Sequence, residues 1–97
     1  MVDNRALVSY IILKLMNVRE RIEELRRRAG NVYPRELMRL AEAAGWSPRK
    51  GGKHNVQYEK AGCGKFPIPT HPGPMKSKRT VYKILSRIED CLDKEES

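Results

Sequence analysis

The segment NVQYEKAGCGKFPIPTH, residues 55–71, decides the fold because it has the pattern of two short strands joined by a turn. Apolar residues or threonine alternate with polar residues or prolines in two runs, 55–60 and 65–71. The residues expected on one face are Val56, Tyr58, Phe66, Ile68 and Thr70. A period of two is typical of strands with one buried face, and AGCG (61–64) supplies the turn. Proline lacks an N–H, so Pro67 and Pro69 confine the second strand to a sheet edge or to a short pairing.

The flanking segments predict helices on both sides of this hairpin. Upstream, Pro34 suits a first helical position, and Leu37, Leu40, Ala41 and Ala44 form an inner face that Gly45 and Trp46 close. The segment WSPRK (46–50) is expected to add a short, weak strand. Downstream, the apolar period runs through Val81, Ile84, Leu85, Ile88, Cys91 and Leu92, with Ser77 or Thr80 as the cap and a frayed acidic end, DKEES.

The first part of the chain predicts one more helix, over residues 4–29. Its apolar residues are spaced alternately by three and four positions, which is a heptad seam. They are Val8, Ile11, Leu15, Val18, Ile22, Leu25 and Ala29. Gly30 is expected to end this helix as a left-handed cap. So much apolar surface needs a partner, and we expect it to pack on its own domain, on a second copy, or on both.

Together these segments predict an α+β fold, with a helix, a three-strand antiparallel meander and a helix preceded by a long extra N-terminal helix. Residues 1–30 are interpreted as an amphipathic extension and residues 31–97 as the functional domain. Ninety-seven residues favour a shallow surface site over a large enclosed pocket.

The charge of the chain is concentrated in one region. Residues 46–83 hold nine cationic residues and one acidic residue, while the net charge of the whole chain is +8. A local excess of positive charge favours partners that carry phosphate groups. The alternative is a basic surface with no particular partner.

The sequence predicts a cytoplasmic protein. The longest apolar run, residues 6–16, contains a lysine and is too short to cross a bilayer. No small-residue cleavage site of a signal peptide follows it. The two cysteines, Cys63 and Cys91, do not have metal-ligand spacing, and we expect both to be reduced. No cofactor or metal site is expected.

The stretch KGGKHNVQY (50–58) places His54 in a glycine turn next to two lysines. A ring that titrates near neutrality can take a proton from a ribose 2′-hydroxyl or protonate the leaving oxygen of a phosphodiester. Gly51 and Gly52 would let the backbone approach a ligand closely, and Lys50 and Lys53 would contact phosphates. The alternative is an exposed hairpin histidine without a role.

Two further groups of residues extend this candidate site. His71 follows the edge strand and is either a second acid/base group or a structural histidine bonded to backbone. Lys76, Lys78 and Arg79 precede or open the last helix and are candidate phosphate contacts, with an ordinary solvated basic turn as the alternative.

Four segments in order resemble the HicA family of bacterial and archaeal toxins. They are ELMRLAEAAGW (36–46), GGKHNVQY (51–58), FPIPTHPG (66–73) and KRTVYKIL (78–85). The family pattern is a helix ending in Gly-aromatic, a Gly-x-His turn, a Val-Pro-x-His strand, and a helix with Thr before Ile-Leu. Lys53 and Asn55 stand where the family commonly has Ser or Thr and a second His.

The resemblance implies a fold like that of double-stranded-RNA-binding domains and an endoribonuclease that cleaves messenger RNA, neutralised by a HicB-type antitoxin. It implies a catalytic role for His54, with His71 as a possible assistant. RNA-binding residues would be Lys50, Gly52, Lys53, Lys76, Lys78 and Arg79. Two other hypotheses are a non-catalytic RNA-binding module of the same fold and an assembly protein that dimerises through its first helix.

Overall fold

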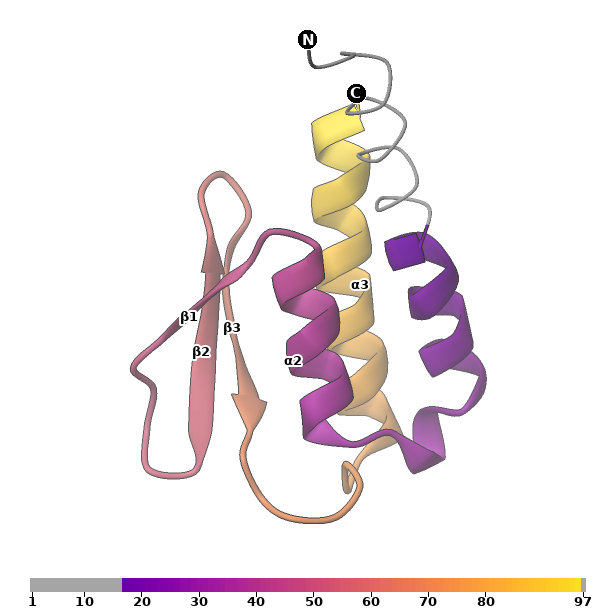
Figure 1. Ribbon diagram of the computed structural model, residues 1–97, viewed down its shortest axis with the longest axis vertical. Coiled ribbons are helices and arrows are strands. Elements are labelled where there is room, and N and C mark those ends of the chain that lie inside the picture. Colours follow the sequence, from indigo (N-terminus) through magenta and orange to yellow (C-terminus); the bar gives the residue numbers. More distant parts are fainter. Residues whose placement is uncertain (1–16, 97) are drawn as a thin grey trace, which may run out of the picture.

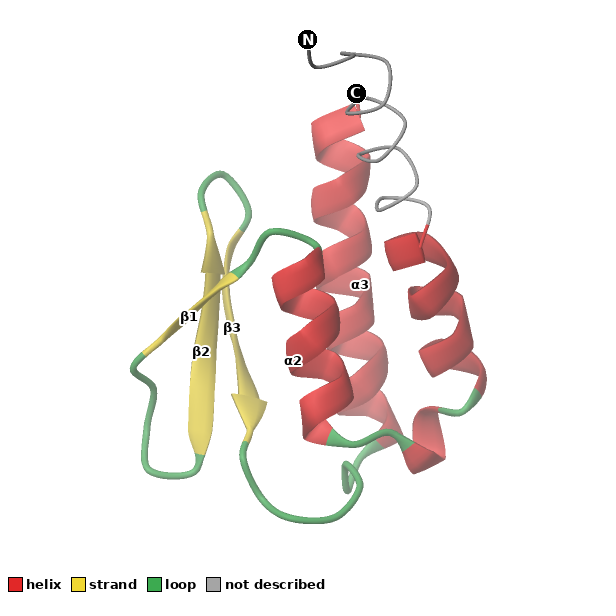
Figure 2. Ribbon diagram, viewed as in Figure 1, coloured by secondary structure: helices red, strands yellow, loops and turns green. Residues whose placement is uncertain are grey.

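The computed structural model describes residues 17–96 of the chain. In order, it contains a helix over residues 17–27, η1 (Ala29–Asn31), α2 (Pro34–Ala43), β1 (Ser47–Arg49), β2 (Asn55–Lys60), β3 (Gly64–Pro69) and α3 (Lys78–Glu96). The sheet lies on one side, α2 and α3 lie in the middle, and the N-terminal helix lies on the far side of both (Figures 1 and 2). This arrangement confirms the predicted α+β order, while residues 4–16 of the predicted first helix lie outside the described residues.

The sheet is the predicted antiparallel meander, in the order β1-β2-β3. Tyr58 is opposite Phe66, and Val56 is opposite Ile68. The side chains of Tyr58, Phe66 and Ile68 are buried, and that of Val56 packs against the core. The alternation read from the sequence therefore assigns these residues to the correct face.

The predicted edge position of β3 is also confirmed. The backbone N–H of Thr70 donates to the carbonyl of His54 at 2.9 Å, so alternate residues of this run face β2. Pro67 and Pro69 fall at the other positions, where an N–H would point away from β2. The outer edge of β3 thus has few donors to offer another strand.

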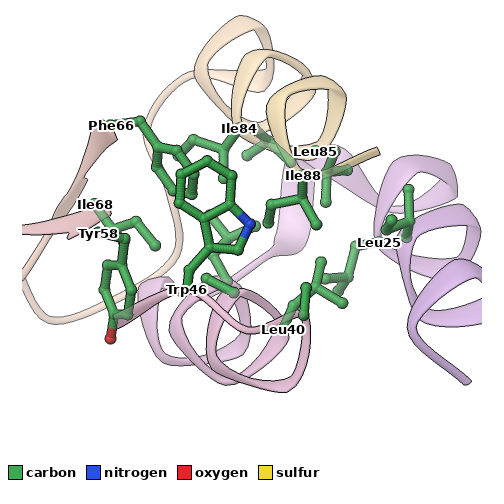
Figure 3. Close-up of a cluster of buried hydrophobic side chains, with 14 of the residues drawn as sticks. Leu25, Leu40, Trp46, Tyr58, Phe66, Ile68, Ile84, Leu85 and Ile88 are labelled. Atoms are coloured by element: carbon green, nitrogen blue, oxygen red, sulfur yellow. The ribbon is translucent and has the colours of Figure 1, made fainter. Parts of the chain in front are cut away.

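One hydrophobic core joins all the layers. The ring of Trp46 lies 4.7 Å from that of Phe66, between the sheet and the side chains of α3 (Figure 3). Val18, Ile22, Leu25 and Ala29 belong to the same buried cluster, so this half of the predicted seam packs on its own domain. The packing predicted for Tyr58 is confirmed, and burial raises the pKa of its phenol, which donates to Glu42 at 3.4 Å.

The end of α2 follows the prediction, but that of the first helix does not. Gly45 has a φ of +93°, and the N–H of Trp46 donates to the carbonyl of Ala41 at 2.9 Å, which satisfies the end of α2. The prediction that Gly30 is a left-handed cap is wrong. The first helix ends at residue 27, and Gly30 lies in a 3-10 turn in which the N–H of Asn31 donates to the carbonyl of Arg28 at 2.8 Å.

The start of α3 and its buried face are as predicted, whereas its end is not. The Ser77 hydroxyl accepts the N–H of Thr80 at 3.3 Å, and all six apolar positions of the predicted stripe are buried. The expected fraying of the acidic end is wrong, because the helix continues to Glu96.

The acidic end of α3 forms ion pairs with residues of other elements. Arg19 pairs with Asp93 at 3.0 Å and with Glu96 at 2.8 Å, and Lys60 pairs with Glu95.

The expectation that both cysteines are reduced is wrong in the structure. Cys63 and Cys91 form a disulfide with a Cα–Cα distance of 5.7 Å. It joins the turn between β2 and β3 to α3, and Lys94 reinforces this contact by donating to the carbonyl of Gly62 at 2.7 Å. The spacing of the two cysteines in the sequence does not indicate the pair, because it is the fold that brings the turn to the helix.

Within residues 17–96, no helix is long and apolar enough to span a membrane.

Replacing both cysteines with alanine should lower the free energy of unfolding by about 3–4 kcal/mol, because the disulfide spans 28 residues and restricts the unfolded chain. Urea denaturation with and without a thiol reductant measures the effect. Reductant should destabilise the parent by a similar amount and leave the double variant unchanged. A parent with the same midpoint in both conditions would contradict the prediction.

Candidate nucleic-acid interface

One end of the molecule collects the segments that the sequence singled out. The loop between β1 and β2 (50–54), the connection between β3 and α3 (70–77), and the N-terminal ends of α2 and α3 all lie there (Figure 1). We call this the basic end. Because β2 and β3 are antiparallel, the residue that precedes β2 and the residue that follows β3 are neighbours. Residues far apart in the chain thus meet on one surface.

The cations of the basic end differ from those of the N-terminal helix. Five exposed side chains there form no ion pair within residues 17–96. They are Lys50, Lys53, Lys76, Lys78 and Arg79. On the N-terminal helix, by contrast, Arg26 pairs with Glu89 of α3 at 3.1 Å. The basic end therefore carries five positive charges without an acidic partner in the described residues.

Arginines of the N-terminal helix and of the residue that follows it pair with acidic residues. Just after it, Arg28 donates to Glu36 of α2 at 2.6 Å, and this hydrogen bond raises the pKa of the Arg28 guanidinium. Hydrogen bonding from Arg21 lowers the pKa of Glu24. These pairs are partly exposed, so each adds little stability, but they neutralise the charge of this part of the surface.

The loop that carries His54 folds back against β2. A Cβ on Gly51 would lie 2.6 Å from the carbonyl oxygen and from Oδ1 of Asn55, so only glycine fits there. The N–H of Gly52 donates to Oδ1 of Asn55 at 3.0 Å, which fixes the turn. A Cβ on Gly52 would make only ordinary contacts, the nearest at 3.5 Å. The packing of the loop therefore requires Gly51, whereas Gly52 stays a predicted RNA contact.

His54 is exposed at the end of this turn. Within the described residues its side chain forms no hydrogen bond, and its carbonyl accepts the N–H of Thr70. The backbone is therefore held while the ring is available to a ligand. An exposed imidazole on a fixed backbone can exchange protons with a bound substrate.

The ring of His71 is oriented by its neighbour. Its Nδ1 lies 3.2 Å from the carbonyl oxygen of Pro72. A carbonyl only accepts hydrogen bonds, so Nδ1 must carry the proton and the neutral ring keeps an unprotonated Nε2. This contact agrees with the structural interpretation of His71, and it also leaves a nitrogen that can act as a base.

The two histidines are brought together through their backbones, on neighbouring strand ends. Their side chains differ in surroundings, because His71 lines a groove beside α2 and His54 is not among its lining residues. Lys76 lies farther along the same connection, and Lys78 is the first residue of α3. The connection is anchored by the buried Met75, whose N–H donates to the carbonyl of Val32 at 2.6 Å.

The groove itself was not predicted from the sequence. Tyr33, Arg35 and Arg39 line it from the start of α2, opposite His71 and Thr70. One signal was present, because two arginines at i and i+4 lie outside the apolar face of the helix. The pattern does not say what faces them, since that depends on the path of the chain after β3.

One group of potential metal ligands lies close together within residues 17–96. It consists of Cys63, Cys91 and Glu95, whose ligand atoms are within 4.8 Å of one another. The two sulfur atoms are joined in the disulfide, and a metal ligand must be a thiolate. This group is therefore not the donor set of a metal site while the disulfide is present.

Comparisons with protein-family models, with curated proteins and with solved structures find no match to this chain.

The neutral ring of His71 should be the Nδ1–H tautomer, because the Pro72 carbonyl can only accept. Long-range ¹⁵N–¹H spectra recorded at a pH where both rings are neutral distinguish the tautomers. His54 is the internal control, since no such carbonyl is paired with its ring in the described residues. A predominant Nε2–H tautomer for His71 would contradict the assigned contact.

Proposed function

We propose that this chain is an endoribonuclease of the HicA type that cleaves messenger RNA by histidine acid/base catalysis. The observation that carries the proposal is that the backbones of two histidines lie on neighbouring strand ends, at the end of the molecule that also carries five cations without acidic partners within residues 17–96. A phosphodiester needs both elements, since its cleavage moves protons and builds negative charge.

Cleavage of an RNA phosphodiester by this route requires two proton transfers. A base takes the proton of the 2′-hydroxyl, the 2′-oxygen attacks the adjacent phosphorus, and an acid protonates the departing 5′-oxygen. The products are a 2′,3′-cyclic phosphate and a 5′-hydroxyl. His54 is the principal acid/base group in this proposal, and His71 is its possible assistant through Nε2. Lys50 and Lys53 flank His54 and would balance charge at the phosphate.

One further partner of this proposal comes from the resemblance, and another comes from the apolar seam of the first helix. A HicB-type antitoxin would bind the chain in the cytoplasm and block cleavage. A homodimer through the N-terminal helix is a further part of the proposal. Three of its expected contact residues, Val8, Ile11 and Leu15, lie outside the described residues, while Val18, Ile22 and Leu25 are buried within the chain's own core.

A second candidate function is RNA binding without cleavage. The position of Lys53 and Asn55 around His54 favours it, since the HicA pattern commonly has Ser or Thr and a second His there. The same basic end would then hold RNA while the histidines contribute only contacts.

His54→Ala should lower RNA cleavage by roughly 100- to 10,000-fold, the usual effect of a positioned acid or base. The variant should still fold and bind RNA, because Gly51 and Asn55 keep the turn. Cleavage should persist in EDTA and leave 2′,3′-cyclic phosphate ends, which are read by gel analysis of end-labelled RNA. His71→Ala is the comparison, and a smaller loss would assign it an orienting role.

Equal cleavage by His54→Ala and the parent would remove the catalytic role of His54. RNA binding by the parent without any cleavage would support the binding module. Neither binding nor cleavage would leave the assembly hypothesis.

Replacing Lys76, Lys78 and Arg79 with alanine should weaken RNA binding across sequences. Each phosphate contact on a single strand contributes roughly 0.7 to the slope of log affinity against log salt concentration, so the slope should fall by about 2. Fluorescence anisotropy over a salt series measures it. Lys65→Ala is the control, since this exposed lysine lies near the turn at the other end of β3 and should leave the slope unchanged. An unchanged slope in the triple variant would place the phosphate contacts elsewhere.

A further inference from the structure

The groove beside α2 has a volume of about 860 Å³. It runs between α2 and the start of the connection from β3 to α3. Its lining includes apolar side chains, two arginines, a tyrosine and His71. Small-molecule sites of this volume are usual in proteins, and a nucleoside is smaller than the groove.

The groove combines an apolar floor with a cationic rim. Met38 and Val56 are partly buried and pack against the core. Arg35 and Arg39 are exposed, lie one helical turn apart, and form no ion pair within residues 17–96. A flat apolar ligand with attached phosphates would match this combination.

Two further side chains, Tyr33 and Glu36, bear on how well the groove would fit such a ligand. Tyr33 is one of two large hydrophobic residues exposed in the described chain, at 45%. Its ring is therefore available for stacking. Glu36, the one acidic residue in the lining, is held by Arg28 at 2.6 Å, so its charge is already neutralised by the segment that follows the N-terminal helix. The groove is therefore cationic in spite of this carboxylate.

We propose that the groove takes one unstacked base of an RNA strand, with the base against Tyr33 and the flanking phosphates on Arg35 and Arg39. This proposal rests on the proposed function, because it supplies the RNA and places the bound nucleotide beside His71. An aromatic side chain binds any base by stacking, whereas a base inside a duplex is already stacked and paired. The protein should therefore prefer unpaired over paired RNA.

The sheet also contributes to a second groove, whose lining has different side chains. It lies along the outer side of β3, where Arg87 already donates to the carbonyl of Lys65 at 3.1 Å. Tyrosine and tryptophan are missing from its lining, and Phe66 is buried. It lacks the exposed ring that base stacking requires.

The test compares two tyrosines of similar exposure. Tyr82 on α3 is 43% exposed and does not line the groove, so Tyr82→Ala is the matched control for Tyr33→Ala. The probes are a fluorescent 2′-O-methyl RNA strand and the duplex that it forms with its complement. The methyl groups remove the 2′-hydroxyl nucleophile, so binding is measured by anisotropy without cleavage.

Tyr33→Ala should weaken single-strand binding roughly 5- to 150-fold, the usual effect of losing one base-stacking ring. Tyr33→Phe should restore it, and duplex binding should change little. Arg39→Ala should weaken single-strand binding and lower its salt dependence. Circular dichroism and thermal melting of each variant check that the fold is retained.

Equal effects of Tyr33→Ala and Tyr82→Ala, or a parent that binds duplex as tightly as single strand, would overturn the proposal for the groove. Either result leaves the proposed function standing if the parent still cleaves RNA and His54→Ala does not. A parent that binds neither probe and cleaves no RNA would overturn both proposals.

Discussion

The register between β2 and β3 is the constraint on which the other features depend. Tyr58 opposite Phe66 and Val56 opposite Ile68 direct one face of the hairpin to the core. A slip of one residue would reverse every side chain and turn Pro67 toward β2, where it has no N–H to donate. The same register sets Thr70 against His54. Core formation and the meeting of the two histidine-bearing segments are therefore consequences of one pairing.

The second condition for the candidate site is that paired charges and unpaired positive charges lie on different parts of the surface. The basic residues of the N-terminal helix and the acidic residues of α2 and α3 neutralise one another, as in the pairs Arg26–Glu89 and Arg28–Glu36. The helix lies on the outer side of α2 and α3, opposite the sheet (Figure 1), and its apolar residues are buried in the core. Because the acidic residues are used there, few remain near the loop 50–54 and the connection 70–77. Five cations of the basic end thus keep their positive charge without an acidic partner in the described residues.

The regular spacing of apolar residues predicted the helices and strands, because buried residues recur at that spacing along each of them. The inner faces of α2 and α3, the hairpin, the edge position of β3 and the Gly45 cap all follow from local patterns of apolar residues, proline and glycine. The disulfide could not be predicted this way, since Cys63 lies in a turn and Cys91 on a helix. The end of α3 is paired with Arg19, which is distant in sequence. The groove was missed for the same reason, because its two walls come from segments 30 or more residues apart.

The two ends of the hairpin are held very differently, and this difference suits the proposed use of the basic end. The turn 61–63 is tied to α3 by the disulfide, and Arg87 and Lys94 donate to its carbonyls or to that of Lys65. The loop 50–54 has one side-chain hydrogen bond in the described residues, from Gly52 to Asn55. A segment with few anchoring contacts opens at low free-energy cost. Adjustment to a ligand is therefore easier in the loop 50–54, except at the His54 carbonyl that Thr70 holds, than in the turn 61–63.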